Sequence, residues 1–114
     1  MNKFEDERGI IEDLKVGKDW SVTYISFKKG AVRGNHYHLN TVQSDFILSG
    51  RFICATSMGE KVVKAGETIV HEEGEHHAYE ALEDGEMVST CHGKRIGENY
   101  EEDTFRLLDG EKLL

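Results

Sequence analysis

Two histidines, His36 and His38, stand two residues apart in the stretch GAVRGNHYHLNTVQ (residues 30–43), directly after a glycine-rich turn. On a β-strand, side chains two residues apart point to the same face, so this spacing places the two imidazoles together. A surface strand gains little from such a pair, whereas a metal site or a catalytic base can use it. The chemistry then depends on which other donor groups join the pair.

Two further residues offer suitable donor atoms. Gln43 follows His38 after a gap of four residues, and His77 comes much later in the chain. Imidazole nitrogen is the commonest protein ligand for divalent first-row metals, so three imidazoles and one oxygen donor form a plausible ligand set. The alternative is that these are structural histidines, but burying three imidazoles without partners would cost about 1–3 kcal/mol each. If the residues share one interior, the pattern therefore favours a metal site.

The sequence pattern predicts that strands supply this interior. The chain has no proline, and its twelve glycines fall mostly between short runs rich in Val, Ile, Thr, Phe and Tyr, as is typical of short strands. The predicted strands are Gly9–Asp13, Trp20–Phe27, Val32–His38, Ser44–Leu48, Arg51–Ser57, Glu60–Val63, Thr68–His71, His77–Ala81, Met87–His92 and Asp103–Leu107. Many short strands at close spacing predict an all-β sandwich or barrel.

Length and charge limit what the chain can do. The 114 residues fit one domain, and the net charge of −8 argues against nucleic acid as a partner. A phosphorylated small substrate would need a local basic patch. No apolar run is long enough to span a bilayer, and the N-terminus MNKFEDERG lacks the apolar core of a signal peptide, which predicts a cytoplasmic protein without a membrane partner. Cys54 and Cys91 are expected to be buried thiols and do not make a disulfide framework.

Both ends of the chain are predicted to flank this core. Residues 1–14 are expected to form an N-terminal strand segment, and residues 98–114 a C-terminal tail or edge strand. Within the tail, the charge run Glu101–Asp103 predicts a solvated face or turn. The segment Thr104–Leu107 could add an edge strand to this domain or to a partner subunit.

Two motifs in the sequence resemble those of the cupin superfamily. The spacing Gly30-x5-His36-x-His38-x4-Gln43-x6-Gly50 resembles the first cupin motif, with Gln43 where many members have glutamate. The spacing Gly66-x5-Glu72-x-Gly74-x2-His77 resembles the second motif, with Glu72 replacing the usual proline and Ala81 the usual asparagine. This resemblance covers about half the chain. It implies a single cupin domain over residues 1–114, which is a small antiparallel jelly-roll β-barrel holding one metal ion, often in a homodimer.

The glutamine at position 43 changes the chemistry that the resemblance implies. A glutamate would bring a negative charge to the metal, whereas the carbonyl of Gln43 is neutral, so the site would be a stronger Lewis acid. This favours polarising a carbonyl or an enediolate over redox chemistry at iron. The set His36, His38, Gln43 and His77 also resembles that of small cupins that process uronate-derived sugars. In the alternative, Gln43 only hydrogen-bonds a histidine ligand. Zinc, nickel, manganese and iron all accept these donors.

A finer resemblance concerns cupins that act on nucleotide-linked sugars. The stretches Arg33-Gly-Asn-His36-Tyr-His38 and Phe4-Glu-Asp6-Glu-Arg8-Gly9-Ile10 resemble signatures of their epimerases and ketoisomerases. In the metal-free epimerases, the histidine at the position of His36 is the base that removes a proton next to a keto group. That role conflicts with His36 as a metal ligand, and His38 resembles the metal-binding or ketoisomerase branches more closely.

Four further residues are candidates for substrate binding or proton transfer. Arg33 and Arg51 could pair with a carboxylate or phosphate through two hydrogen bonds, or could be surface or rim residues. Tyr79 shares a strand face with His77 and is either a proton donor or a packing residue. His92, near the end of a late strand, is either a general base or a structural histidine.

The two remaining histidines are predicted to lie outside the site. His76 is adjacent to His77 and should point to the opposite face of the strand. His71 belongs to neither donor group.

The sequence thus predicts a metal-dependent cupin that isomerises, epimerises or dehydrates a carbohydrate, whether a sugar, a uronate or a nucleotide-sugar, by Lewis-acid-assisted proton transfer. An iron-dependent dioxygenase is a second enzyme hypothesis. A non-catalytic metal- or sugar-binding cupin is a third, because fold alone does not separate a binder from an enzyme. Convergent acid–base groups beside the metal would favour an enzyme, and an apolar wall would favour a binder.

Overall fold

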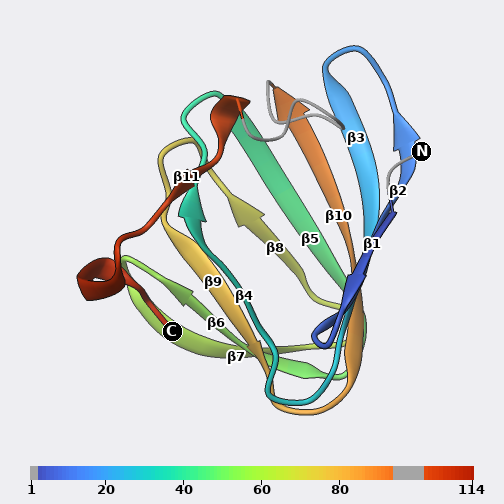
Figure 1. Cartoon of the computed structure of the whole chain (residues 1–114), viewed down its shortest axis with the longest axis vertical. Helices are drawn as coiled ribbons and strands as arrows, with labels where there is room; N and C mark the ends of the chain where they lie inside the picture. The colour runs from blue at the N-terminus through green and yellow to red at the C-terminus, as the bar shows by residue number, and fades with distance from the viewer. Residues whose placement is uncertain (1–2, 94–101) are drawn as a thin grey trace.

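The computed structural model describes residues 3–93 and 102–114, which form two antiparallel sheets facing each other (Figure 1). The strands of the six-stranded sheet are, in spatial order, β1 (Lys3–Asp6), β2 (Gly9–Val16), β3 (Trp20–Phe27), β10 (Gly85–Gly93), β5 (Thr41–Ser49) and β8 (Thr68–His71). Those of the five-stranded sheet are β11 (Phe105–Arg106), β4 (Val32–Tyr37), β9 (His77–Ala81), β6 (Arg51–Thr56) and β7 (Gly59–Lys64). A short 3-10 helix, η2, covers Asp109–Glu111.

The predicted all-β jelly roll is confirmed. Three predicted strands, Trp20–Phe27, Thr68–His71 and His77–Ala81, have the predicted bounds, and most others differ by a few residues at their ends. The last strand is shorter than predicted, because only Phe105–Arg106 pairs with β4. No helix among the described residues is long and apolar enough to cross a membrane.

The inner face of the six-stranded sheet changes from apolar to polar along its length. Residues paired in register share a face, so each row of partners across β3, β10 and β5 lines the interior together. The first row is apolar, and the next two rows are polar apart from Cys91. These rows are Ile25, Met87 and Ile47; then Thr23, Ser89 and Asp45; then Ser21, Cys91 and Gln43. His71 of β8 continues the third row beside Gln43.

The hydrophobic core fills the apolar end of the barrel. It includes Phe27, Ile47, Phe52 and Met87, each at most 2% exposed, and the rings of Phe27 and Phe52 pack edge to face with centroids 4.8 Å apart. Such contacts stabilise the two sheets against each other. The polar rows at the other end therefore form a buried polar chamber supported by this core.

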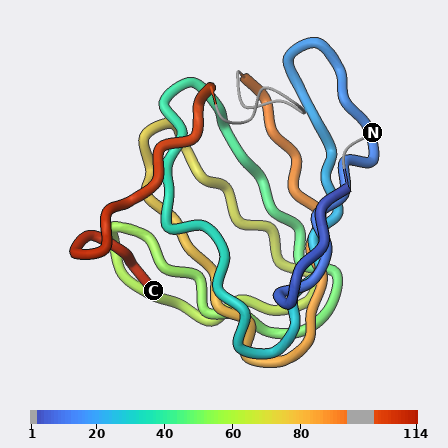
Figure 2. Tube along the Cα trace, viewed as in Figure 1, coloured from blue at the N-terminus to red at the C-terminus, as the bar shows by residue number. Residues whose placement is uncertain are grey.

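The C-terminal segment follows the edge of the five-stranded sheet (Figure 2). Its strand β11 pairs with β4 at Phe105 and Tyr37, and at Arg106 and His36. The predicted edge strand therefore belongs to the same chain. The first part of the predicted tail, residues 98–101, lies outside the described residues.

A β-bulge in β4 aims its side chains into the barrel. Arg33 pairs with Tyr79, and His36 pairs with His77, so Asn35 is an extra residue on the β4 side. Simple alternation would put Arg33 and His36 on opposite faces, but the extra residue brings both to the inner face. Asn35 has a left-handed backbone (φ 56°), and its side chain accepts hydrogen bonds from the backbone NH groups of Leu113 and Leu114 at 2.8 and 3.1 Å.

The residue before the bulge leads to a prediction, because Gly34 combines a φ of +96° with close packing. A Cβ there would lie 2.9 Å from the carbonyl oxygen of His77 and 3.0 Å from Cα of Ala78. We expect Gly34→Ala to lower the free energy of unfolding by about 1–3 kcal/mol in urea denaturation. The control Gly110→Ala, where a Cβ meets nothing within 4 Å, should leave it nearly unchanged. Equal effects of the two substitutions would contradict this account of the bulge.

Candidate metal centre

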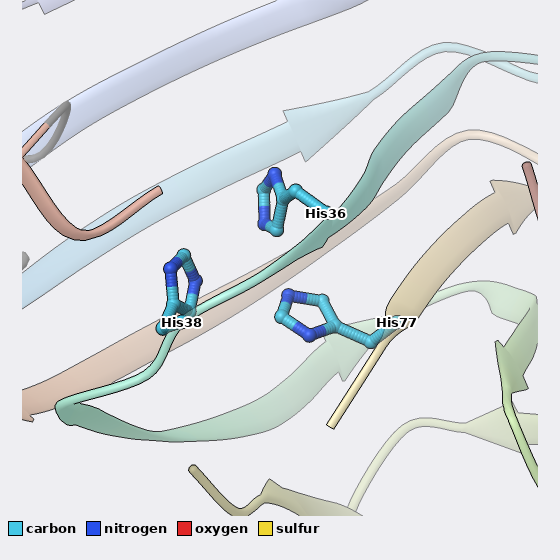
Figure 3. Close-up of side chains that lie close together, drawn as sticks. All are labelled: His36, His38 and His77. Atoms are coloured by element: carbon cyan, nitrogen blue, oxygen red, sulfur yellow. The ribbon is translucent and has the colours of Figure 1, made fainter. Parts of the chain in front are cut away.

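Three histidines point toward one another inside the barrel: His36 on β4, His38 directly after the end of β4, and His77 on the adjacent strand β9 (Figure 3). Each offers a ring nitrogen, and these atoms all lie within 4.8 Å of one another. His38 and His77 are 2% and 1% exposed, and His36 is partly buried. His36, His38 and His77 could therefore hold a metal ion, and the partial exposure of His36 leaves the cluster open on one side.

The orientation of His38 is fixed by a carbonyl group on the far side of its ring. Its Nδ1 donates a hydrogen bond to the backbone oxygen of Asp103 at 2.8 Å, so the neutral imidazole presents the lone pair of Nε2 to the interior. That Nε2 lies 3.2 Å from Oε1 of Gln43. The amide nitrogen of Gln43 in turn donates to both carboxylate oxygens of Asp45 at 3.0 Å. Gln43 therefore presents its carbonyl oxygen to His38.

Two hydrogen-bond acceptors thus face each other in a buried space. Either a proton on Nε2 of His38 or a cation beside both atoms is needed to make this contact favourable. Two ligands about 2.1 Å from one ion and at right angles lie about 3 Å apart, which matches the separation of these atoms. The geometry therefore fits Gln43 as an oxygen donor next to the histidines.

His77 offers a second lone pair in the same space. Its Nδ1 donates to the backbone oxygen of Glu75 at 3.4 Å, and its Nε2 is buried without a hydrogen-bond partner among the described residues. Burial, followed by the positive charge of nearby His71, lowers the pKa of His77 to about 3. His77 is therefore neutral at pH 7, which is the form that binds metals.

A buried network supports the donors from behind. The Tyr79 hydroxyl donates to Asp45 at 2.7 Å, and Nε2 of His71 lies 2.6 Å from that hydroxyl and 3.3 Å from Asp45. The other ring nitrogen of His71 lies 2.7 Å from the Glu75 carboxylate. The rings of His71 and His77 stack with centroids 4.3 Å apart. These contacts fix Gln43 through Asp45, and His77 through His71.

The charges in this network compensate each other. Burial alone would raise the pKa of Asp45, but the hydrogen bond and charge of His71 outweigh it and lower the pKa. Burial alone would lower the pKa of His71, but Asp45 and then Glu75 raise it. Burial and the Asp45 charge raise the pKa of Tyr79, which keeps the phenol protonated. Asp45 and Glu75 thus both favour the protonated form of His71, which lies between these two carboxylates beside the cluster.

Asp103 anchors the loop that carries His38. Its carboxylate accepts hydrogen bonds from the backbone NH groups of Leu39 and Asn40 at 3.1 and 2.9 Å and from the Thr41 hydroxyl at 2.7 Å. Burial would raise its pKa, but these bonds lower it. The prediction of a solvated Glu101–Asp103 run is wrong at this residue, because Asp103 is 1% exposed. Glu102 is exposed, and Glu101 lies outside the described residues.

The other candidate residues are distributed between the interior and the outer surface. Arg33 and Tyr79 point inward and are 7% and 3% exposed. Arg51 is exposed and lies 3.7 Å from Glu83, and its neighbour Phe52 takes the inward position. His92 is exposed on the outer face, because its neighbour Cys91 points inward. The structure therefore brings neither Arg51 nor His92 to the cluster.

Two histidines outside the cluster differ in their distance from it. His76 stacks on Tyr37 at 4.7 Å, on the side away from His77, as strand alternation predicts. His71 was expected outside the site, but it packs directly on His77. The sequence did contain one indication of the network behind the ligands. Gln43 and Asp45 are two residues apart on one strand, so Asp45 places a carboxylate next to the proposed amide ligand.

Comparisons with known proteins identify the fold. No protein-family model and no curated protein matches the sequence. KdgF from Halomonas sp. matches with a TM-score of 0.74 and 20% identity over 83% of this chain and 88% of that chain. A conserved Klebsiella pneumoniae protein with a double-stranded β-helix domain matches with a TM-score of 0.69 and 18% identity, over 75% and 72% of the two chains. The fold is that of the cupins.

A third match is to part of a larger protein. CapF from Staphylococcus aureus, a capsular polysaccharide assembling protein, matches with a TM-score of 0.72 and 21% identity. The match covers 93% of this chain and 32% of CapF. At these identities the likeness shows a shared fold.

The low pKa of His77 predicts how stability depends on pH in metal-free protein. The unfolded state binds a proton near pH 6.5, and the folded state does so only near pH 3. Stability therefore falls as the pH falls through this window, by up to about 1.4 kcal/mol per pH unit from this group. The variant His77→Gln should lack this contribution in urea denaturation between pH 6.5 and 3. Parallel curves for the two proteins would show that His77 is not held neutral by burial.

Proposed function

We propose that this protein is a metal-dependent enzyme that isomerises, epimerises or dehydrates a small carbohydrate by moving a proton next to a carbonyl group. The proposal is carried by one observation, which is the neutral donor set of three imidazoles and the Gln43 amide oxygen. No carboxylate within residues 3–93 and 102–114 joins the histidine cluster. A divalent ion held by such ligands keeps its positive charge.

The charges around the cluster support the same chemistry. Asp45 is the carboxylate directly behind Gln43, and its negative charge is paired with His71 at 3.3 Å. Because the Asp45 charge is paired, it offsets little of the charge of a bound ion, and the second carboxylate of this network, Glu75, lies at the other ring nitrogen of His71 at 2.7 Å. When bound, the metal would supply a Lewis acid for a carbonyl or enediolate oxygen.

The residues of the chain would hold and orient this site. Nε2 of His38 and Nε2 of His77 are aimed by the backbone oxygens of Asp103 and Glu75. Asp45 holds the Gln43 amide so that its oxygen points inward. Such contacts behind metal ligands fix ring orientation and limit reorganisation during reaction. His36 lies on the more open side of the cluster, where a substrate can approach.

The proton-transfer group is a separate part of the proposal. Tyr79 already donates its hydroxyl hydrogen to Asp45, and its raised pKa opposes loss of the proton. Asp13 of β2 is a second candidate, because it pairs in register with Thr23 and accepts a hydrogen bond from the Thr23 hydroxyl at 2.9 Å. Thr23 is on the inner face and Asp13 is half-buried, so this carboxylate faces the chamber and remains accessible. We propose Asp13 as the base to test alongside Tyr79.

A carbohydrate substrate is also supported by the likeness to CapF, which assembles capsular polysaccharide. A cytoplasmic location and a homodimer remain predictions from the sequence.

Proton abstraction can be tested without knowing the final product. Protein loaded with zinc, nickel or manganese is incubated in D2O with a panel of aldoses, ketoses and uronates, and proton NMR follows the C–H next to the carbonyl. We expect exchange of that proton for deuterium with at least one compound. The double variant His36→Ala, His38→Ala should lose both bound metal and exchange. Gln43→Glu should keep the metal and slow exchange by roughly tenfold or more, because it brings a negative charge to the ion.

The same experiment includes a control variant and distinguishes the proposed enzyme from a binding protein and from a dioxygenase. His76→Ala removes a histidine stacked on the outer face and should change neither metal content nor exchange. Saturable sugar binding without exchange would favour a binding protein, and oxygen uptake by iron-loaded protein would favour a dioxygenase. Absence of bound metal after incubation with excess divalent ions would contradict the proposal.

A further inference from the structure

A second feature of the molecule is a basic pocket beside the bulge of β4. Its volume is about 500 Å³, and it lies between the β1–β2 turn, β4 and the C-terminal segment. Its charged lining residues are Arg8, Arg33, Arg106, Lys112 and Asp109. Four cations therefore meet one acid in a protein whose net charge is −8.

Two of these cations already have carboxylate partners. Arg8 lies 2.7 Å from Asp6, and Lys112 lies 3.3 Å from Asp109. Arg33 on β4 differs from these two, because its buried Nε and Nη1 have no hydrogen-bond partner among the described residues.

Arg33 is the residue that points to a ligand. It is 7% exposed, and its Nη2 donates to the backbone oxygen of Ser26 at 3.2 Å, while Nε and Nη1 are buried without a hydrogen-bond partner in the described part of the chain. Its guanidinium lies 5.2 Å from the centre of the Phe27 ring. A buried cation with unused donors is costly unless an anion pairs with it. Burial, and then the Arg8 charge, lower the pKa of Arg33, and the charge of Asp6 offsets these effects only in part.

We infer that this pocket binds the carboxylate or phosphate group of a sugar whose reacting carbon lies at the histidine cluster. This inference deepens the proposed function and, in its second half, rests on it. Guanidinium donors are well suited to both anions, because they form charge-assisted hydrogen bonds to two oxygens.

The position of the pocket sets the size of the substrate. Arg33 and His36 are three residues apart on one strand, so their Cα atoms are separated by at most about 10 Å. Arg106 pairs in register with His36, which brings a second cation to the same part of β4. A single sugar ring with one charged substituent spans this distance. The substrate class is therefore a monosaccharide acid or a monosaccharide phosphate.

Anion binding by the pocket can be tested on metal-free protein. A negative result then counts against the pocket and does not depend on the metal site. Isothermal titration calorimetry at low ionic strength uses inorganic phosphate, glucuronate and uncharged glucose. We expect saturable binding of at least one anion and none of glucose. Arg33→Met should weaken anion binding by at least tenfold, and the exposed β7 control Lys64→Met should not. Tighter phosphate binding would indicate a sugar phosphate, and tighter glucuronate binding a sugar acid.

The double variant His36→Ala, His38→Ala shows whether the anion binds at the pocket or at the histidines. Unchanged binding supports a pocket distinct from the histidines, and loss of binding would overturn the inference. Absence of saturable binding to the parent protein, or equal binding by Arg33→Met, would also overturn it, whatever the metal content.

A stability measurement separates a binding arginine from a structural one. Without added anion, Arg33→Met should raise the Tm, because it removes a buried charge whose Nε and Nη1 have no hydrogen-bond partner among the described residues. Phosphate should raise the Tm of the parent protein more than that of the variant. A lower Tm for Arg33→Met together with equal phosphate shifts would make Arg33 a structural residue and the inference wrong.

Discussion

The central physical constraint in this protein is the convergence of acceptor lone pairs in a buried chamber. Within the described residues, Nε2 of His77 lacks a hydrogen-bond partner there, and Nε2 of His38 faces Oε1 of Gln43 at 3.2 Å. Each of the three side chains also has an NH group on its far side, and that NH group is hydrogen-bonded to the protein. His77 donates to Glu75, His38 to Asp103 and Gln43 to Asp45, so the acceptor atoms are held pointing inward. A site built this way is ready for a cation, because the cost of orienting the ligands is met by folding.

The C-terminal segment holds this arrangement at two places. Asp103 fixes His38 and the loop after it, and Asn35 binds the backbone of Leu113 and Leu114 at the bulge that turns His36 inward. Charge is distributed unevenly around the chamber. Beneath the ligands, His71 lies between the Asp45 and Glu75 carboxylates, whereas Nε and Nη1 of Arg33 at the neighbouring pocket have no hydrogen-bond partner among the described residues. Together these features suit a neutral ligand set with a place for a substrate anion nearby.

Much of the fold could be predicted from local sequence, because short β-rich runs between glycines indicate strands and two motifs resemble those of the cupin β-barrel. The predicted donors His36, His38 and His77 do converge. Features that depend on contacts between distant segments could not be predicted. In the local sequence Asp103 is part of a charge run. In the structure its carboxylate is buried and accepts hydrogen bonds from Leu39, Asn40 and Thr41, which lie more than sixty residues earlier in the chain. Strand alternation alone could not show the bulge at Asn35, and the role of His71 depends on its stacking with His77.

The most direct test of the central claim is a crystal structure of the protein grown with excess zinc. We predict one ion inside the barrel, about 2.0–2.2 Å from a ring nitrogen of each of His36, His38 and His77 and from Oε1 of Gln43. The amide nitrogen of Gln43 should still contact Asp45. An ion bound elsewhere would contradict the account. An ion held by the histidines without contact to Oε1 of Gln43 would contradict it too.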